Sequence, residues 1–85
     1  MFNALTIKQV QTHLGQWCKT LRKTEGLTQA ELGEKLAMSR LTISKLERGE
    51  NFTIDSVLKI LQYFDKLKIL DDFIEDQSAP PEPLY

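Results

Sequence analysis

Apolar side chains recur at intervals of three and four residues along most of the chain, which is the period of one face of an α-helix. Val10, Leu14, Trp17 and Leu21 form the first such stripe, and Gly26 ends it. The same period returns in four further segments, so we predict an all-α protein. The predicted helices cover residues 5–24, 29–36, 40–47, 54–64 and 66–76.

The predicted helix starts carry N-cap residues between apolar positions. Thr28 and Glu31 form a capping box before the second helix. Ser39, Thr53 and Asp65 hold the N-cap position before the third, fourth and fifth helices, each with apolar neighbours at the spacing of a hydrophobic staple. We therefore expect these four residues to begin their helices.

The second and third predicted helices are short and follow each other closely. Their N-caps, Thr28 and Ser39, are only 11 positions apart. Two helices joined by so tight a turn cross steeply and share a core. The crossing leaves the third helix as a ridge that fits the major groove of DNA. We expect the shared core to consist of Leu32, Leu36, Ile43 and Leu46.

A helical wheel places four residues of the third helix away from this core or at its edge. Arginine or lysine can donate to guanine, leucine can contact a thymine methyl group, and serine can serve either base type. Leu41 is the most informative of them, because an exposed leucine between two cations has little structural purpose, although single exposed leucines are common. The predicted base-contacting residues are Arg40, Leu41, Ser44 and Lys45.

Phosphate contacts are expected at the starts of both short helices, where backbone N–H groups attract anions, and in the polar loop after the third helix. Gln29 is free to reach a phosphate because Thr28 already caps the helix. These residues are otherwise ordinary caps and loop residues, and capping is compatible with phosphate contact. The predicted phosphate-contacting residues are Thr28, Gln29, Ser39, Arg48, Asn51 and Thr53.

The run LTQAELGEKLAMSRLTISKLERG, residues 27–49, resembles the helix-turn-helix of the lambda-repressor-like family, also called Cro-type or XRE-type. The resemblance extends loosely over residues 5–65. It implies a compact five-helix domain that binds operator DNA as a two-fold dimer. It also implies that Gln29 contacts a phosphate and that Glu47 makes a structural polar contact within the domain.

Two positions depart from the family pattern. Gly33 stands where the family usually has alanine, and Ala37 where it usually has glycine. Gly33 still allows close helix approach at a propensity cost of about 1 kcal/mol. Ala37 either adopts a left-handed turn conformation at some strain or the turn differs.

A weaker resemblance links residues 52–76 to HipB-like antitoxins, which are small XRE proteins that pair with a kinase-like toxin and repress their own promoter. The fifth helix of this region carries surplus apolar surface, and operator binding requires two-fold symmetry. We therefore expect a homodimer interface there, although the same residues could instead cap the monomer's own core. The predicted interface residues are Leu67, Leu70, Phe73 and Ile74.

The remaining features of the C-terminal third do not indicate a further functional site. Residues 66–69 alternate like a short strand, but the helical period continues better beyond them. Acidic side chains beside the apolar face could bind a divalent metal, yet nothing else marks an oxygen cage.

We expect a helix-turn-helix domain over residues 1–76, with the motif at 28–48 and the dimerisation helix at 66–76, and an extended proline-rich tail at 77–85.

The charges of the 85 residues are unevenly distributed. Residues 1–51 carry eight cations and five acids, and residues 52–85 carry three cations and seven acids, which gives the net charge of −1. This asymmetry indicates two surfaces with different roles. The length suits one small domain, and Cys18, as the single cysteine, cannot form an internal disulfide.

Two functions remain open from the sequence. The first is a sequence-specific double-stranded DNA-binding transcriptional regulator, a repressor that acts as a homodimer on a palindromic operator. The alternative is a HipB-like antitoxin or adaptor whose main partner is another protein, with autoregulatory DNA binding. We expect a cytoplasmic protein without a signal peptide, membrane span, cofactor, metal site or catalytic activity, because no motif indicates any of these.

Overall fold

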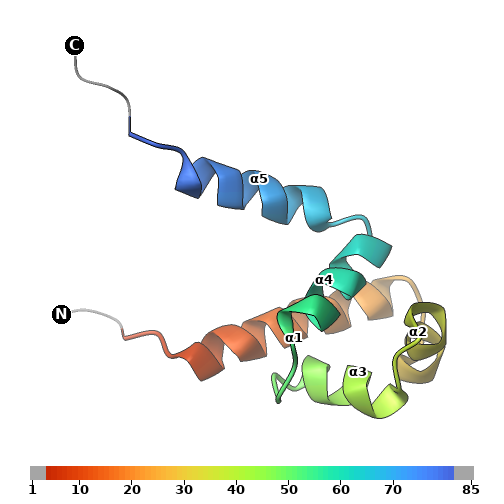
Figure 1. Ribbon diagram of the computed structural model, residues 1–85. Coiled ribbons are helices and arrows are strands. Elements are labelled where there is room, and N and C mark those ends of the chain that lie inside the picture. The colour runs from red at the N-terminus through yellow and green to blue at the C-terminus, as the bar shows by residue number, and fades with distance from the viewer. Residues whose placement is uncertain (1–3, 82–85) are drawn as a thin grey trace.

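The computed structural model describes residues 4–81, and within them the chain forms five α-helices and no strand. The described part is therefore all-α, as predicted, and the segment 66–69 is not a strand. Figure 1 shows α5 extending away from the other four helices, which pack together. The helices are α1 (Ile7–Thr24), α2 (Gln29–Leu36), α3 (Arg40–Glu47), α4 (Ile54–Tyr63) and α5 (Leu67–Ser78).

The hydrophobic core is built by α1 to α4. Seven apolar side chains from these helices are at most 1% exposed, and α5 contributes none of them. Burial raises the pKa of the Cys18 thiol to about 12, so this cysteine stays protonated at neutral pH. The core residues are Cys18, Leu32, Ile43, Leu46, Val57, Ile60 and Leu61.

The first four helices end in the same kind of turn. In each turn a residue with positive φ follows the helix, and the next N–H bonds to a carbonyl five residues back, which is the Schellman arrangement. Ala37 takes this position after α2 with φ 55°, so the left-handed alternative is the one adopted. The four turn residues are Gly26, Ala37, Gly49 and Asp65.

Three of the four predicted N-caps are confirmed. The side chains of Thr28, Ser39 and Thr53 accept hydrogen bonds from the backbone N–H three residues later. The prediction for Asp65 is wrong, because this residue has φ 58° and closes α4. Lys66 therefore precedes α5 without a side-chain cap.

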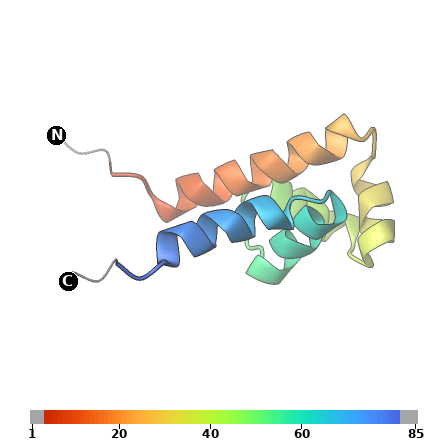
Figure 2. The ribbon, with the colours of Figure 1, turned by 90° about the horizontal axis from the view of Figure 1, so that it is seen from above.

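The ends of α1 and α5 lie on one side of the molecule. Figures 1 and 2 show the N-terminal end of α1 and the C-terminal end of α5 projecting in the same direction, away from α2. α5 continues to Ser78, so the non-helical tail begins two residues later than predicted; its last part, 82–85, lies outside the described residues. No helix within residues 4–81 is both long enough and apolar enough to cross a bilayer.

Candidate nucleic-acid interface

The junction of α2 and α3 is closed by apolar packing. Leu32, Ile43 and Leu46 are fully buried, and Leu36 packs against them in part. Gly33 allows the start of α3 to approach α2, because a Cβ atom there would collide with the carbonyl oxygen of Met38. The expected shared core is thus present, and Figure 1 shows the two helices crossing steeply.

The outer face of α3 carries the predicted combination of one apolar and two basic side chains. Leu41 is 55% exposed, and Arg40 and Lys45 are exposed on the same helix. Within the described residues, the chain leaves more than half of this leucine uncovered. The face therefore combines hydrogen-bond donors with a methyl-bearing surface, which is the chemistry that distinguishes base pairs in the major groove.

Ser44 does not belong to this exposed face, so the expectation of an outward hydroxyl is wrong. The residue is 9% exposed, and its Oγ accepts a hydrogen bond from Arg48 Nη1 at 2.6 Å. Arg48 follows four residues later and folds back over the serine, since positions i and i+4 are neighbours on a helix. A helical wheel gives the direction of a side chain but not what covers it.

A buried ion pair joins α1 to α3 behind this face. Arg22 Nε and Nη2 donate to the two carboxylate oxygens of Glu47 at 2.6 and 2.9 Å. Arg22 Nη1 also donates to the carbonyl oxygen of Leu27 at 2.7 Å. The hydrogen bond to Glu47 raises the pKa of Arg22, against the opposite effect of burial. The structural polar contact expected for Glu47 is therefore present.

Gln29 links this ion pair to the exposed face. Its Nε2 donates to Glu47 Oε1 at 3.1 Å, and its Oε1 accepts from Arg40 Nη1 at 3.4 Å. The two charged partners orient the amide, because the carboxylate only accepts and the guanidinium only donates. The Gln29 side chain is thus engaged on both sides, but its amide carries a second N–H that can donate to a phosphate.

Three of the predicted phosphate-contacting residues at helix starts, Thr28, Ser39 and Thr53, are exposed, and Gln29 is half-buried. Thr28 and Ser39 lie at the first turns of α2 and α3, where their side chains serve as caps. Thr53 caps α4, and its Oγ1 accepts from Ser56 N at 3.2 Å. Capping leaves the remaining first-turn N–H groups of α2 and α3 available to an anion.

The loop after α3 holds Arg48 against an acid. Arg48 Nε and Nη2 donate to the carboxylate of Glu50 at 3.1 and 3.4 Å. Asn51 is exposed beside it with φ 36°. Lys8 reaches this loop from α1, where its Nζ donates to the carbonyl oxygen of Gly49 at 2.8 Å.

Sequence reasoning missed Arg22, Lys8 and Glu50. Arg22 lies four residues after the buried Cys18, so its place beside the apolar stripe of α1 was a usable signal. Lys8 and Glu50 carry no such local signal, because they lie 42 positions apart and only the fold brings the charge of Lys8 near the Glu50 carboxylate.

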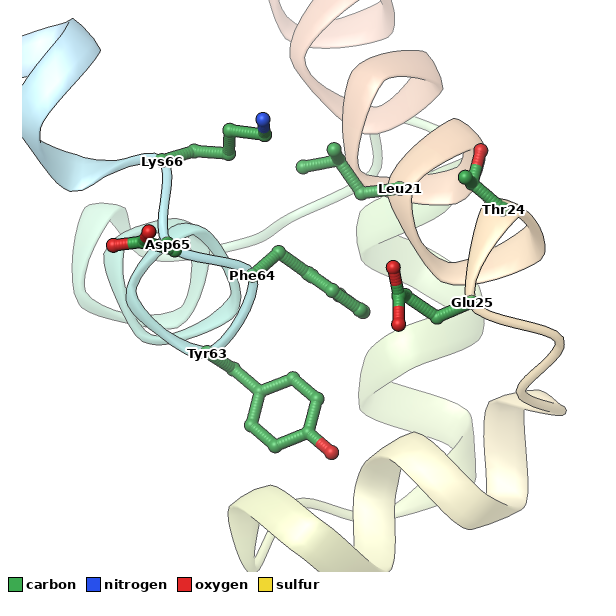
Figure 3. A pocket seen from close by; sticks show the side chains of 7 residues that line it. All are labelled: Leu21, Thr24, Glu25, Tyr63, Phe64, Asp65 and Lys66. Atoms are coloured by element: carbon green, nitrogen blue, oxygen red, sulfur yellow. The ribbon is translucent and has the colours of Figure 1, made fainter.

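A cavity of about 470 Å³ lies between the C-terminal ends of α1 and α4. Figure 3 shows Phe64 pointing toward Glu25 and the Lys66 side chain directed toward Leu21. The rings of Tyr63 and Phe64 meet edge to face with centroids 5.0 Å apart. None of the predicted DNA-contacting residues lines this cavity, so it is separate from the candidate interface.

The predicted dimer face of α5 divides into two halves. Leu67 and Leu70 pack against the core in part, as the monomer-capping alternative expects. Phe73 and Ile74 are 63% and 49% exposed, so the second half has no such cover in the described chain. An open groove of about 540 Å³ runs between α4 and α5 and is lined by Leu58, Leu67, Lys68, Leu70, Asp71 and Ile74.

An exposed acidic cluster lies on the same helix. The carboxylates of Asp71, Asp72 and Glu75 lie within 4.8 Å of one another. Asp72 is paired with Lys68 at 3.2 Å. Exposed acidic groups of this kind are common without a metal ion.

Comparison with known proteins agrees with this geometry. Residues 19–70 match the family described as helix-turn-helix. A protein of Methanospirillum hungatei, provisionally named an HTH-type transcriptional regulatory protein, is 36% identical over 70 residues, which are 81% of this chain and 23% of that protein. A protein of the same name from Methanocella arvoryzae is 39% identical over 51 residues, 60% of this chain and 16% of its own length.

Antitoxin HipB of Escherichia coli K12 is 33% identical over 72 residues, which cover 84% of this chain and 78% of HipB. The chain thus spans less than a quarter of the two regulators but most of the antitoxin. Both resemblances noted in the sequence are confirmed. The chain belongs to the Cro/XRE-type helix-turn-helix family.

Proposed function

We propose that the protein is a sequence-specific double-stranded DNA-binding transcriptional regulator, a repressor that acts as a homodimer on a palindromic operator. The observation that carries this proposal is the outer face of α3, where Leu41 stays 55% exposed between Arg40 and Lys45 while the opposite face is fully buried. More than half of this leucine stays exposed to water in the free protein, and its burial in a complex would be favourable.

The residues of the interface then divide between contacts to bases and contacts to phosphates. Arg40 and Lys45 donate to guanine O6 and N7, and Leu41 contacts a thymine methyl group. Thr28, Gln29, Ser39, Arg48, Asn51 and Thr53 hold the phosphate backbone around α3. We assign Ser44 to the support of Arg48 rather than to a base, because its hydroxyl is already bound by that guanidinium.

Selection of bound duplexes from random DNA at near-physiological salt tests the proposal. We expect an enriched palindromic motif with half-sites about 10 base pairs apart. The affinity for the selected operator should fall steeply with salt, because roughly 6–10 phosphates are neutralised per dimer. Selection without an enriched motif would contradict sequence-specific binding.

Variants separate base contacts from phosphate contacts. Arg40→Ala, Leu41→Ala and Lys45→Ala should change the base preference of the selected motif, whereas Arg48→Ala should weaken binding to all duplexes alike. Lys68→Ala is the matched control, since it removes one positive charge from α5, which lies outside the candidate interface. Equal effects of Lys45→Ala and Lys68→Ala on base preference would contradict the assignment.

The dimer is proposed to form through α5. Phe73 and Ile74 supply exposed apolar surface that a two-fold partner can cover, and Leu67 and Leu70 border it along the groove. Sedimentation at micromolar concentration should show a dimer. Ile74→Asp should give a monomer with an unchanged helical spectrum, while Gln77→Asp, which adds an acid to the same helix and removes no apolar group, should remain dimeric. A wild-type monomer would contradict the proposal.

A second candidate function is favoured by the likeness to antitoxin HipB over most of both chains. In this case the acidic and apolar sides of α5 dock on a partner protein, and DNA binding is autoregulatory. Purification from the native host distinguishes the two functions. A partner protein at fixed stoichiometry, released by Ile74→Asp, supports the antitoxin or adaptor, whereas a DNA-binding dimer without a partner supports the regulator.

A further inference from the structure

The loop that closes α3 places one acid among three cations. The carboxylate of Glu50 is held by Arg48 through two hydrogen bonds of 3.1 and 3.4 Å. Lys45 lies on the last turn of α3, and its carbonyl oxygen accepts the Glu50 N–H at 2.8 Å. Lys8 is anchored beside the loop by its bond to the Gly49 carbonyl oxygen.

The backbone, more than the side chains, sets this arrangement. Gly49 has φ 72° and forms the left-handed turn that ends α3. Its Cα packs so closely on α1 that an added Cβ would lie 2.8 Å from the Cα of Thr12. The turn and the close approach therefore fix where Glu50 leaves the helix and keep the Lys8 end of α1 next to it.

The contacts show that the carboxylate is bound as an anion. Its hydrogen bonds to Arg48 lower the pKa of Glu50, and the charges of Lys8 and Lys45 add to this effect. The side chains of Arg48 and Glu50 are 52% and 46% exposed, so the pair can exchange partners in water. An arginine fork binds a carboxylate and a phosphate with the same geometry.

We propose that Glu50 occupies an anion site formed by Lys8 and Arg48, and that a DNA phosphate displaces it when the protein binds. This inference rests on the proposed DNA-binding function and adds Lys8 to the phosphate-contacting residues. Glu50 is then an internal competitor, which lowers the affinity for every duplex to the same degree. Sequence preference stays with Arg40, Leu41 and Lys45, so Glu50 increases the dependence of binding on correct base contacts.

The test measures duplex affinity by fluorescence anisotropy over a series of salt concentrations, on the selected operator and on a scrambled duplex. Glu50→Gln should bind both duplexes about fivefold more tightly per protomer at 0.1 M salt. Its salt slope should stay close to that of the wild type, because the same phosphate is neutralised in both complexes and only the competition with Glu50 is lost. Lys8→Gln should weaken binding to both duplexes by a similar factor.

Glu75→Gln is the matched control, because it removes the same charge from exposed α5. The inference is overturned if Glu50→Gln and Glu75→Gln bind operator equally while the wild type binds it well, an outcome that leaves the proposed function intact. The proposed function itself fails if the wild type binds no duplex.

A DNA-independent measurement tests the anion site itself. Inorganic phosphate titrated against the Glu50→Gln variant should shift the NMR resonance of the Arg48 Nε–H group at lower concentration than in the wild type. An unchanged midpoint would show that the carboxylate does not compete for this site, and would overturn the inference whatever the DNA measurements give.

Discussion

The α3 helix and the α5 helix show opposite relations to the rest of the molecule. α3 has eight residues, of which four are buried, and its start is capped by Ser39. α5 has twelve residues, none of them buried, and it starts without a side-chain cap. The short helix is fixed by contacts with α1 and α2, whereas the longer one keeps apolar surface that its own chain does not cover.

Their ion pairs repeat this contrast. Arg22–Glu47 has side chains 8% and 2% exposed, and each carboxylate oxygen accepts a hydrogen bond from the guanidinium. Lys68–Asp72 on α5 has side chains 82% and 56% exposed. A buried pair cannot lose one partner without leaving an uncompensated charge, while an exposed pair is replaced by water. Four substitutions test this contrast between the region around α3 and the α5 helix.

The largest effect is expected from Glu47→Ala. This change leaves the Arg22 guanidinium buried without its counter-charge and should lower the free energy of unfolding by about 3–5 kcal/mol. Urea unfolding followed by circular dichroism measures the loss. The double variant Arg22→Met with Glu47→Leu should recover much of it, because no unpaired charge then remains. A single variant as stable as the wild type would contradict the role of the pair.

Ala37→Gly should increase stability. Ala37 has φ 55°, a conformation that costs an alanine about 1 kcal/mol and a glycine very little. We expect a gain of about 0.5–1 kcal/mol in thermal unfolding. Ala30→Gly, inside α2, is the control and should instead lose up to about 1 kcal/mol. If both variants were destabilised, the strain assigned to this turn would be absent.

Asp76→Lys should strengthen α5 alone. The last turn of this helix carries acids and no base, so its dipole is opposed rather than complemented. A lysine there should stabilise the helix by about 0.3–1 kcal/mol. Slower amide hydrogen exchange in α5, with unchanged exchange in α3, is the expected signal. Asp76→Asn should give a smaller change in the same direction. Equal effects of the two variants would argue against a charge effect.

Asp72→Ala should have the smallest effect. The pair with Lys68 is exposed and joins positions i and i+4, so its removal should cost less than about 0.5 kcal/mol and even less at high salt. Urea unfolding at two salt concentrations measures this. A loss comparable to that of Glu47→Ala would mean that α5 is held by charge rather than by apolar contact.

Much of the fold followed from local patterns. The N-caps Thr28, Ser39 and Thr53 were identifiable because a cap and its bonded N–H lie three residues apart. The buried Leu32 and Ile43 were predictable for a similar reason, since one helical face repeats every three or four residues. Asp65 was misassigned because the same residue type suits both an N-cap and a left-handed helix end.

The amino-acid sequence by itself determined the approximate extent of the helices, the apolar residues of the α2–α3 junction and the exposed position of Leu41, because each follows from the apolar period within a short segment. Only the tertiary structure decided the burial of Ser44, the pairing of Arg22 with Glu47 across 25 positions, and the contact of Lys8 with Gly49 across 41. A charged side chain pairs with the group that the fold brings close to it, and the periodicity of the sequence does not indicate which distant residue that is.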